Sequence, residues 1–204
     1  MLGIPQCRAW YETVTRALLA HAQTRFDGRL WFVPVNYVTG APTGSTQLTE
    51  LSAFYAELVA KGGDRATGSA FYDSWTAVLD RYELIPEAID VKTLAVVDPV
   101  YGLRPEYMNS AFDLWFLTRD EKYLRTAYRY FEALRKNCRV PNGYTTLTDI
   151  RTRPMKLGDH FPAYSFSENF KYLYLMFADS PRFDASNYYL NTEGKVLRGL
   201  VKKA

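Results

Sequence analysis

The sequence has little cysteine and histidine, which restricts the chemistry that it can carry. Cys7 and Cys138 are too few for a disulfide framework and lack metal-ligand spacing, so we expect two free thiols, with a single bridge between them as the alternative. The two histidines, His21 and His160, have no zinc-binding spacing. The sequence also has no serine-hydrolase elbow, P-loop or dinucleotide-binding glycine motif. These absences argue against zinc, serine-hydrolase and nucleotide-dependent functions.

Long apolar runs and clusters of one charge are also missing. The formal net charge is +3 and is spread along the chain, which argues against nucleic acid or an anionic membrane surface as the main partner. No apolar stretch is long enough to span a bilayer. Residues 1–10 contain no apolar run typical of a secretory signal.

Aromatic residues, in contrast, are abundant. Phe, Trp and Tyr make up 16% of the chain. Such rings either fill a core or form a stacking surface for a ligand. We favour an aromatic core, and the ligand platform is the alternative.

The apolar pattern predicts helices joined by short turns, with a few strands. Asp64 and Asp120 are expected to cap two of the helices, and Thr46, or Ser45 beside it, a third. A short strand is expected at residues 30–35, where Pro34 favours an edge position, another at 144–150, and a mixture of loop and strand in the tail at 180–197. The expected helices cover residues 11–24, 46–61, 64–82, 104–118, 120–138 and 162–177. Consecutive helical hairpins build either a solenoid or a closed toroid, and the pattern alone does not decide between them.

Acidic residues are the best candidates for chemistry. Glu87 follows a proline in a loop, and Glu106 lies in the first turn of a predicted helix, where an acid is also a common device that stabilises the helix. Glu168 lies in an aromatic helix, where a buried carboxylate has to be paired or hold a cation, although a surface pair with Lys171 is the simpler reading. Residues 191–194 offer oxygen donors that suit Ca²⁺, or they form an ordinary polar turn.

Five segments, taken in order, resemble the motifs of one enzyme family. They read LRPE, SAFDLWFLTRD, CRVPNGY, ENFKYLYLMF and NTEG, at residues 103–106, 110–120, 138–144, 168–177 and 191–194. This series is similar to glycoside hydrolase family 47, the calcium-dependent α-1,2-mannosidases. Residues 51–64, and the short link from residues 85–88 to the LRPE segment, resemble its ER-degradation-enhancing branch.

The resemblance implies a fold, an activity and a location. We expect an all-α (α/α)7 barrel, or toroid, of helical hairpins with short β-hairpin pieces, and residues 1–204 would be a single partial domain, the carboxy-terminal half of it. The family members are inverting glycosidases that remove α-1,2-linked mannose from high-mannose N-glycans in glycoprotein quality control. The endoplasmic reticulum lumen would be the location, and the missing amino-terminal half would be a partner.

The same resemblance assigns roles near the LRPE segment. Glu106 would be the catalytic general base that activates the attacking water, because an inverting enzyme places a water between its base and the sugar. Arg104 would contact substrate and keep neighbouring carboxylates ionised. Tyr164 stands where the family has a phenylalanine under the sugar ring.

The remaining roles concern a calcium ion. Thr192 would bind Ca²⁺ through its carbonyl and hydroxyl oxygens, and Glu193 would help to hold the ion. Glu168 and Glu87 would bind the waters around the ion or the sugar hydroxyls. The ion would grip the sugar most strongly in the transition state.

The sequence departs from the family pattern at three places. Asn109 replaces an acid three residues after Glu106, and residues 161–164 lack another acid. The general acid of the family lies in the amino-terminal half, which has no counterpart here. We therefore predict that the isolated chain does not hydrolyse mannosides. Besides a piece of an enzyme, we consider a mannose-binding module without activity and a helical scaffold.

Overall fold

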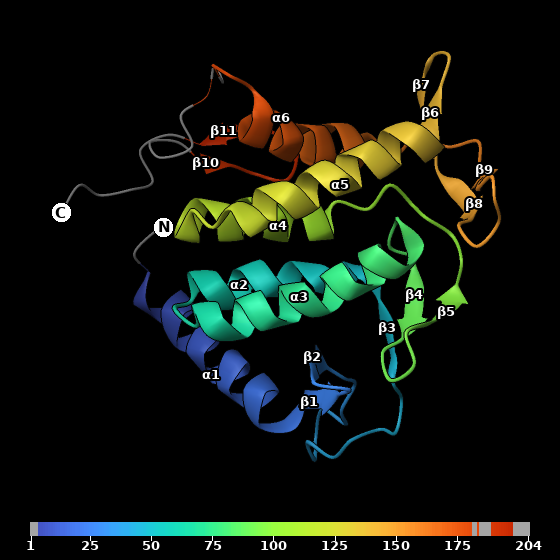
Figure 1. The fold of residues 1–204 in the computed structure, drawn as a ribbon. Helices are drawn as coiled ribbons and strands as arrows, with labels where there is room; N and C mark the ends of the chain where they lie inside the picture. Colours follow the sequence, from blue (N-terminus) through green and yellow to red (C-terminus); the bar gives the residue numbers. More distant parts are fainter. Residues whose placement is uncertain (1–3, 181–182, 184–188, 198–204) are drawn as a thin grey trace.

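The computed structural model describes residues 4–180, 183 and 189–197, and within them the chain consists of helices joined by short β-hairpins (Figure 1). A 3-10 helix, η1 (Glu50–Phe54), runs into α2, and a π-helix, η2 (Ser165–Phe170), runs into α6. No helix of this part is long and apolar enough to cross a membrane. The α-helices are α1 (Pro5–His21), α2 (Tyr55–Lys61), α3 (Arg65–Tyr82), α4 (Glu106–Thr118), α5 (Glu121–Cys138) and α6 (Lys171–Phe177).

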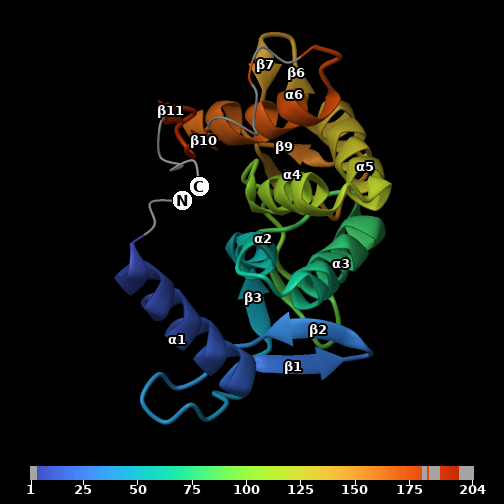
Figure 2. The ribbon, with the colours of Figure 1, turned by 90° about the vertical axis from the view of Figure 1, so that its left-hand side faces the viewer.

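The helices after α1 form two rows. One row consists of α2, α4 and α6, with α4 packed against both of the others. The second row consists of α3 and α5, which lie beside the first row and also contact α4 (Figure 2). Consecutive helices thus alternate between the rows, which is the arrangement of stacked helical hairpins. The expectation of paired helices is therefore confirmed.

Short antiparallel hairpins connect the helices. Strands β1 (Gln23–Phe26) and β2 (Arg29–Phe32) follow α1. A three-stranded sheet has the order β3-β4-β5 and joins the stretch before α2 to the stretch after α3. Its strands and those of the later hairpins are β3 (Gln47–Thr49), β4 (Ala88–Asp90), β5 (Ala95–Asp98), β6 (Arg139–Val140), β7 (Gly143–Tyr144), β8 (Leu147–Asp149), β9 (Lys156–Leu157), β10 (Tyr189–Leu190) and β11 (Val196–Leu197).

Aspartate caps fix the starts of α3 and α5 as the sequence predicts. The Asp64 carboxylate accepts a hydrogen bond from the backbone N–H of Thr67 at 3.0 Å, and Asp120 accepts one from Lys122 at 2.8 Å. Helix α3 ends where Glu83 adopts a left-handed conformation with φ 70°. Both caps are confirmed.

The predicted helix at 46–61 is wrong in its first part. Residues 47–49 form β3, because Leu48 pairs with Ile89 of β4. Thr46 does not cap a helix. Its hydroxyl donates to the Asp90 carboxylate at 2.5 Å. Tertiary pairing therefore overrides a local capping signal, and the first helical turns begin only at Glu50, as η1.

Three other boundaries differ from the prediction. Helix α1 begins at Pro5 and ends at His21, so the last expected residues belong to β1 instead. The expected helix at 162–177 is a π-helix over its first part. The predicted strand at 144–150 is divided between β7 and β8. Of the tail, residues 181–182 and 184–188 lie outside the described residues, and β10 and β11 supply the expected strand.

The aromatic residues build a buried core. Trp31 and Trp75 are fully buried and contact each other edge to face at 5.4 Å, and Tyr72 stacks on Tyr107 at 4.7 Å. Each such side chain contributes about 2–3 kcal/mol through its burial. An aromatic core, which the sequence favours over a ligand platform, therefore accounts for these rings.

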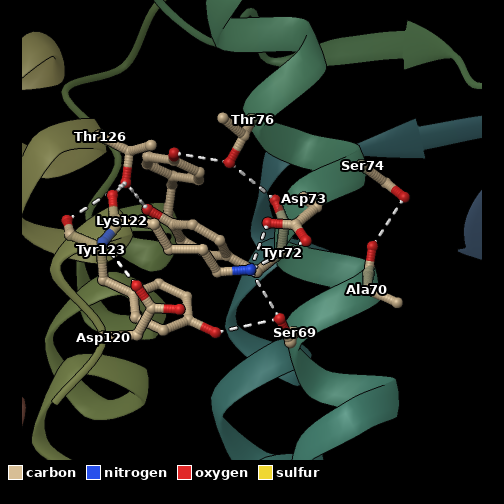
Figure 3. A network of polar contacts seen from close by, with 11 residues as sticks. Ser69, Ala70, Tyr72, Asp73, Ser74, Thr76, Asp120, Lys122, Tyr123 and Thr126 are labelled. Carbon is tan, nitrogen blue, oxygen red and sulfur yellow. Dashed lines mark hydrogen bonds and ion pairs between the residues drawn. The ribbon is translucent and has the colours of Figure 1, made fainter. Parts of the chain in front are cut away.

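Polar contacts between α3 and α5 hold the outer row together (Figure 3). The Lys122 ammonium group donates to both carboxylate oxygens of Asp73 at 3.0 Å and to the Ser69 hydroxyl at 2.8 Å. The hydroxyl groups of Tyr72 and Thr126 share a hydrogen bond one turn further along. These contacts fix the relative register of two neighbouring helical hairpins.

Both cysteines are free thiols, as expected. Cys7 is exposed and Cys138 is buried. Burial raises the pKa of Cys138 to about 12, which makes this thiol unreactive at neutral pH.

Candidate active site

The LRPE segment forms a tight corner at the start of α4. Leu103 is buried and has a left-handed backbone with φ 56°, a conformation that costs a non-glycine residue about 1–3 kcal/mol. Its carbonyl oxygen accepts hydrogen bonds from the Ser165 hydroxyl at 3.1 Å and from the Asn169 side-chain amide at 2.7 Å. The π-helix η2 supplies both donors. The corner is therefore held in place by a helix that lies more than sixty residues later in the sequence.

The neighbouring carbonyls are held in the same way. The Tyr164 hydroxyl donates to the carbonyl of Gly102 at 2.6 Å, and the Tyr130 hydroxyl donates to the carbonyl of Arg104 at 2.9 Å. Tyr130 in turn shares a hydrogen bond with the buried hydroxyl of Tyr101. Three successive carbonyls of the corner thus have side-chain partners, which fixes the direction in which Arg104 and Glu106 project.

Arg104 forms a two-pronged ion pair with Glu87. The distances are 2.7 Å from Nη2 to Oε1 and 3.1 Å from Nε to Oε2, and the side chains are 28% and 20% exposed. The hydrogen bonds to Glu87 raise the pKa of Arg104 further above its usual value. The guanidinium group also lies 5.6 Å from the centre of the Tyr164 ring.

Gly102 leaves room for this cluster. A Cβ atom at this position would stand 3.3 Å from Glu87 Oε2, 3.4 Å from Arg104 Nε and 3.5 Å from the Tyr164 hydroxyl. The first two distances are tighter than ordinary contacts, so a side chain would crowd the ion pair. Glycine here allows the guanidinium group, the carboxylate and the phenol to approach one backbone.

Glu106 lies beside a second glutamate, Glu50. The two carboxyl groups share a hydrogen bond. The Oε2 atom of each is buried without a protein donor. Burial raises the pKa of Glu106, while the hydrogen bond with Glu50 and the charge of Arg104 lower it. Burial and the neighbouring charge of Glu106 raise the pKa of Glu50 far more, because Glu50 is only 1% exposed.

Glu168 lies near this cluster on η2. Burial raises its pKa to about 7, and the charges of Glu106 and Glu193 act in the same direction, against the charge of Lys171. The Lys171 ammonium group donates to the carbonyl of Asn191 at 2.8 Å. Glu168 is therefore a half-buried carboxyl group whose pKa depends on the charges of both Glu106 and Glu193.

The turn that contains Thr192 and Glu193 is exposed. It joins β10 to β11, and the Glu193 carboxylate accepts hydrogen bonds from the Asn191 amide and from the Thr192 hydroxyl. Gly194 closes the turn with φ 78°. Within the described residues, no group of three or more His, Cys, Asp or Glu side chains is placed to hold a metal ion. The donors of this turn are oxygen atoms, which suit calcium in kind, but they are fewer than the six to eight that calcium takes.

A pocket of about 380 Å³ separates this turn from α2 and α4. In it, the Lys61 ammonium group lies 2.6 Å from Asp113 and 2.7 Å from Glu57, and the Asn109 amide donates to Asp113 at 2.8 Å. Burial and the charge of Asp113 raise the pKa of Glu57 to about 7. The polar and charged residues that line the pocket are Glu57, Lys61, Asn109, Asp113, Lys171 and Thr192.

The structure thus brings some predicted site residues together and leaves others apart. Glu87, Arg104, Glu106 and Tyr164 form one cluster, with Glu168 beside it. Thr192 and Glu193 lie on an exposed turn outside this cluster, where Thr192 lines the pocket around Lys61 and the charge of Glu193 acts on Glu168. Sequence reasoning missed Glu50, which falls in the first turn of the helix expected at 46–61. The signal that could have indicated its burial was its place in the sequence, between the apolar residues that pair in β3 and those that pack in η1.

Comparisons with known proteins identify the family of the chain. Residues 2–199 match the sequence profile of glycosyl hydrolase family 47. The chain belongs to glycoside hydrolase family 47. Among its curated relatives is alpha-mannosidase I MNS5 of Arabidopsis thaliana, 34% identical over 85% of this chain and 30% of the relative. Another is the human ER degradation-enhancing alpha-mannosidase-like protein 3, 32% identical over 74% of this chain and 16% of the relative.

A solved structure supports the fold. The α-1,2-mannosidase from Trichoderma reesei matches with a TM-score of 0.79 and 19% identity over 94% of this chain and 47% of that chain. The expected fold class, part of an α/α barrel of helical hairpins, is thereby confirmed. The chain spans less than a third of the two curated relatives and about half of the solved structure.

Proposed function

We propose that this chain is the carboxy-terminal half of a catalytic domain that removes α-1,2-linked mannose from N-glycans, and that residues 1–204 form one partial domain. The observation that supports it best is the cluster of Glu87, Arg104, Glu106 and Tyr164 at the start of α4. It combines a carboxyl group, a fixed cation and an aromatic ring. These are the groups with which a protein binds a sugar and activates water beside it.

Glu106 is the general base in this proposal. Within the described residues, its buried Oε2 atom has no hydrogen-bond partner, so this oxygen keeps its capacity to accept a hydrogen bond. Burial raises its pKa toward neutrality, which improves a base that works near pH 7. Arg104 opposes this shift and keeps the carboxyl group ionised, and Tyr164 offers a ring face to the sugar.

The general acid has to come from outside this cluster. Glu50 bonds directly to Glu106, whereas an inverting enzyme separates its acid and base by about 6.5–9.5 Å to admit a water. The pair is thus too close to serve as acid and base. We therefore propose that an amino-terminal half supplies the group that protonates the leaving oxygen, and we expect the isolated chain not to hydrolyse mannosides.

Calcium is the expected cofactor. Thr192 would bind it through its carbonyl and hydroxyl oxygens and Glu193 through its carboxylate, while Glu168 and Glu87 would bind the waters around it or the sugar hydroxyls. When bound, calcium supplies a positive charge that orients the sugar hydroxyls. Because the turn offers few oxygen atoms, the sugar and water have to complete the coordination shell.

The substrate and location follow from the relatives. One is named an ER degradation-enhancing alpha-mannosidase-like protein, and another, from Sus scrofa, a mannosyl-oligosaccharide 1,2-alpha-mannosidase. High-mannose N-glycans and the endoplasmic reticulum lumen are thus proposed for this chain. An amino-terminal half would complete the barrel, in keeping with the partial coverage of the relatives.

A mannose-binding module without activity is the second candidate. Asn109 favours it, because its neutral amide is engaged with Asp113 where the family has an acid. Such a module would hold the sugar through Arg104 and Tyr164 without cleaving it.

One experiment tests the binding part of both candidates. The purified chain is titrated calorimetrically with α-1,2-mannobiose in Ca²⁺ and in EDTA, with cellobiose as the control sugar. We expect calcium-dependent heat with mannobiose alone, and its loss in Arg104→Met. Absence of mannobiose binding would contradict both candidates. Release of free mannose by the chain alone would contradict the assignment of the general acid to the missing half.

A further inference from the structure

Glu50 is a buried carboxyl group, and no cation among the residues that the structure describes forms an ion pair with it. It lies at the first position of η1 and is 1% exposed. Its Oε1 atom accepts a hydrogen bond from the backbone N–H of Tyr107 at 3.3 Å. Its Oε2 atom is buried and faces no protein donor. A charged carboxylate in such a place is costly, and a proton removes that cost.

The groups around Glu50 reinforce this conclusion. The charged residues that act on it are two further carboxylates, Glu106 and Glu87, and Arg104 is engaged with Glu87. The titratable and charged groups that face the pair come from the loops before α4, from α4, α5 and η2, and they are Glu87, Tyr101, Arg104, Tyr107, Tyr130, Tyr164 and Glu168. Like charges this close cannot both ionise readily.

We propose that Glu50 is a neutral carboxylic acid at pH 7 and that it donates a hydrogen bond to Glu106, which keeps Glu106 ionised and oriented. A buried carboxyl group and a half-buried one that share a hydrogen bond need one proton between them. Glu50 is the deeper of the two, and the charge of Arg104 acts on Glu106. The proton therefore resides on Glu50, and Glu106 keeps a free oxygen for water.

This makes Glu50 a positioning residue. Its importance for catalysis rests on the proposed role of Glu106 as the base, whereas its protonation is a property of the folded chain. In a proton transfer from water, Glu106 would accept the proton on the oxygen that does not face Glu50. The hydrogen bond from Glu50 would stay in place throughout, and no proton would leave Glu50.

The protonation state is tested directly by NMR. The chain is labelled with ¹³C at the glutamate side-chain carboxyl groups and titrated between about pH 4 and 8.5. The Glu50 signal is assigned by its loss in Glu50→Gln, the Glu106 signal by its loss in Glu106→Gln, and Glu12→Gln supplies an exposed control. We expect the Glu50 signal to keep the chemical shift of a protonated acid at pH 7. An ionised Glu50 at pH 7 would overturn the proposal.

The donated hydrogen bond has its own signature. In Glu50→Gln the amide still donates to Glu106, so the pKa of Glu106 stays within about one unit of the parent value. In Glu50→Leu the donor is lost, so we expect the pKa of Glu106 to rise by more than about one unit. If the leucine variant does not fold, the parent titration and the glutamine variant still decide the question. An unchanged Glu106 in a folded leucine variant would overturn the positioning role.

Because the titration needs neither sugar nor calcium, its failure is distinguishable from a failure of the proposed function. A chain that binds no mannoside but holds a proton on Glu50 would refute the function alone. A chain that binds mannobiose while Glu50 is ionised would refute this inference alone.

Discussion

Asn169 anchors the corner that carries the proposed base, so its removal gives a stringent test of the structure. The residue is 1% exposed on η2. Its side-chain amide donates to the carbonyl of Leu103 at 2.7 Å, and its carbonyl oxygen lies 3.2 Å from the Tyr130 hydroxyl, whose one proton it shares with the Arg104 carbonyl. Asn169→Ala removes both contacts and weakens the support of the left-handed Leu103.

The cost follows from these contacts. Each lost hydrogen bond costs about 1 kcal/mol net, and a small buried void adds to this. The Leu103 carbonyl keeps the Ser165 hydroxyl as a partner, so it does not become fully unsatisfied. We therefore expect Asn169→Ala to lower the free energy of unfolding by about 2–3 kcal/mol, a large part of the ~5–15 kcal/mol that stabilises a typical domain.

Urea unfolding followed by tryptophan fluorescence measures this loss. The control is Asn137→Ala, whose amide bonds to the Ala133 carbonyl one turn earlier in the same helix, and it should cost less than about 1 kcal/mol. An Asn169→Ala protein within about 0.5 kcal/mol of the parent would refute the claim that η2 holds the corner.

Three further predictions concern charge and metal. Lys61→Met leaves Glu57 and Asp113 without their cation. We expect a loss of about 1–3 kcal/mol at pH 8 in urea unfolding, less than for a fully buried pair because Lys61 is 34% exposed, and a smaller loss at pH 5.5, where Glu57 is protonated. Lys136→Met, at an exposed pair, should cost under about 1 kcal/mol, and an equal cost in both variants would argue against the buried cluster. Burial raises the pKa of Glu168 to about 7, so the stability from its proton is complete below its unfolded pKa of about 4.3 and is lost as the pH rises through 7. The melting temperature of the parent should therefore fall from pH 6 to pH 8 by more than that of Glu168→Gln, and parallel curves would contradict the shifted pKa. Millimolar Ca²⁺ should raise the melting temperature relative to EDTA, and this rise should vanish in Thr192→Val. Identical melts of the parent in both buffers would count against a calcium site.

The sequence predicts those elements whose signals are local. Asp64 and Asp120 cap α3 and α5 because a carboxylate at a helix start satisfies backbone N–H groups whatever the surroundings. Thr46 carries a similar signal, yet its hydroxyl bonds to Asp90, which lies far along the chain. Nothing in the residues around Thr46 reveals the strand that competes with the helix.

The site divides in a similar way. Arg104 and Glu106 were predicted from a short segment, and the structure places both in the cluster. Glu50 was missed because its role depends on burial against Tyr107 and Glu106, two residues more than fifty positions away. The exposure of Thr192 and Glu193 was also not predictable, since it depends on which segments pack over the final turn.

The most direct test of a mannose site at the corner is a backbone NMR titration of the chain with α-1,2-mannobiose in Ca²⁺. We predict that the largest amide shifts occur around Gly102, Arg104, Glu106 and Tyr164, and that Arg104→Met abolishes them. Shifts confined to the pocket around Lys61, or no saturable shifts at all, would contradict the assignment of sugar binding to this cluster.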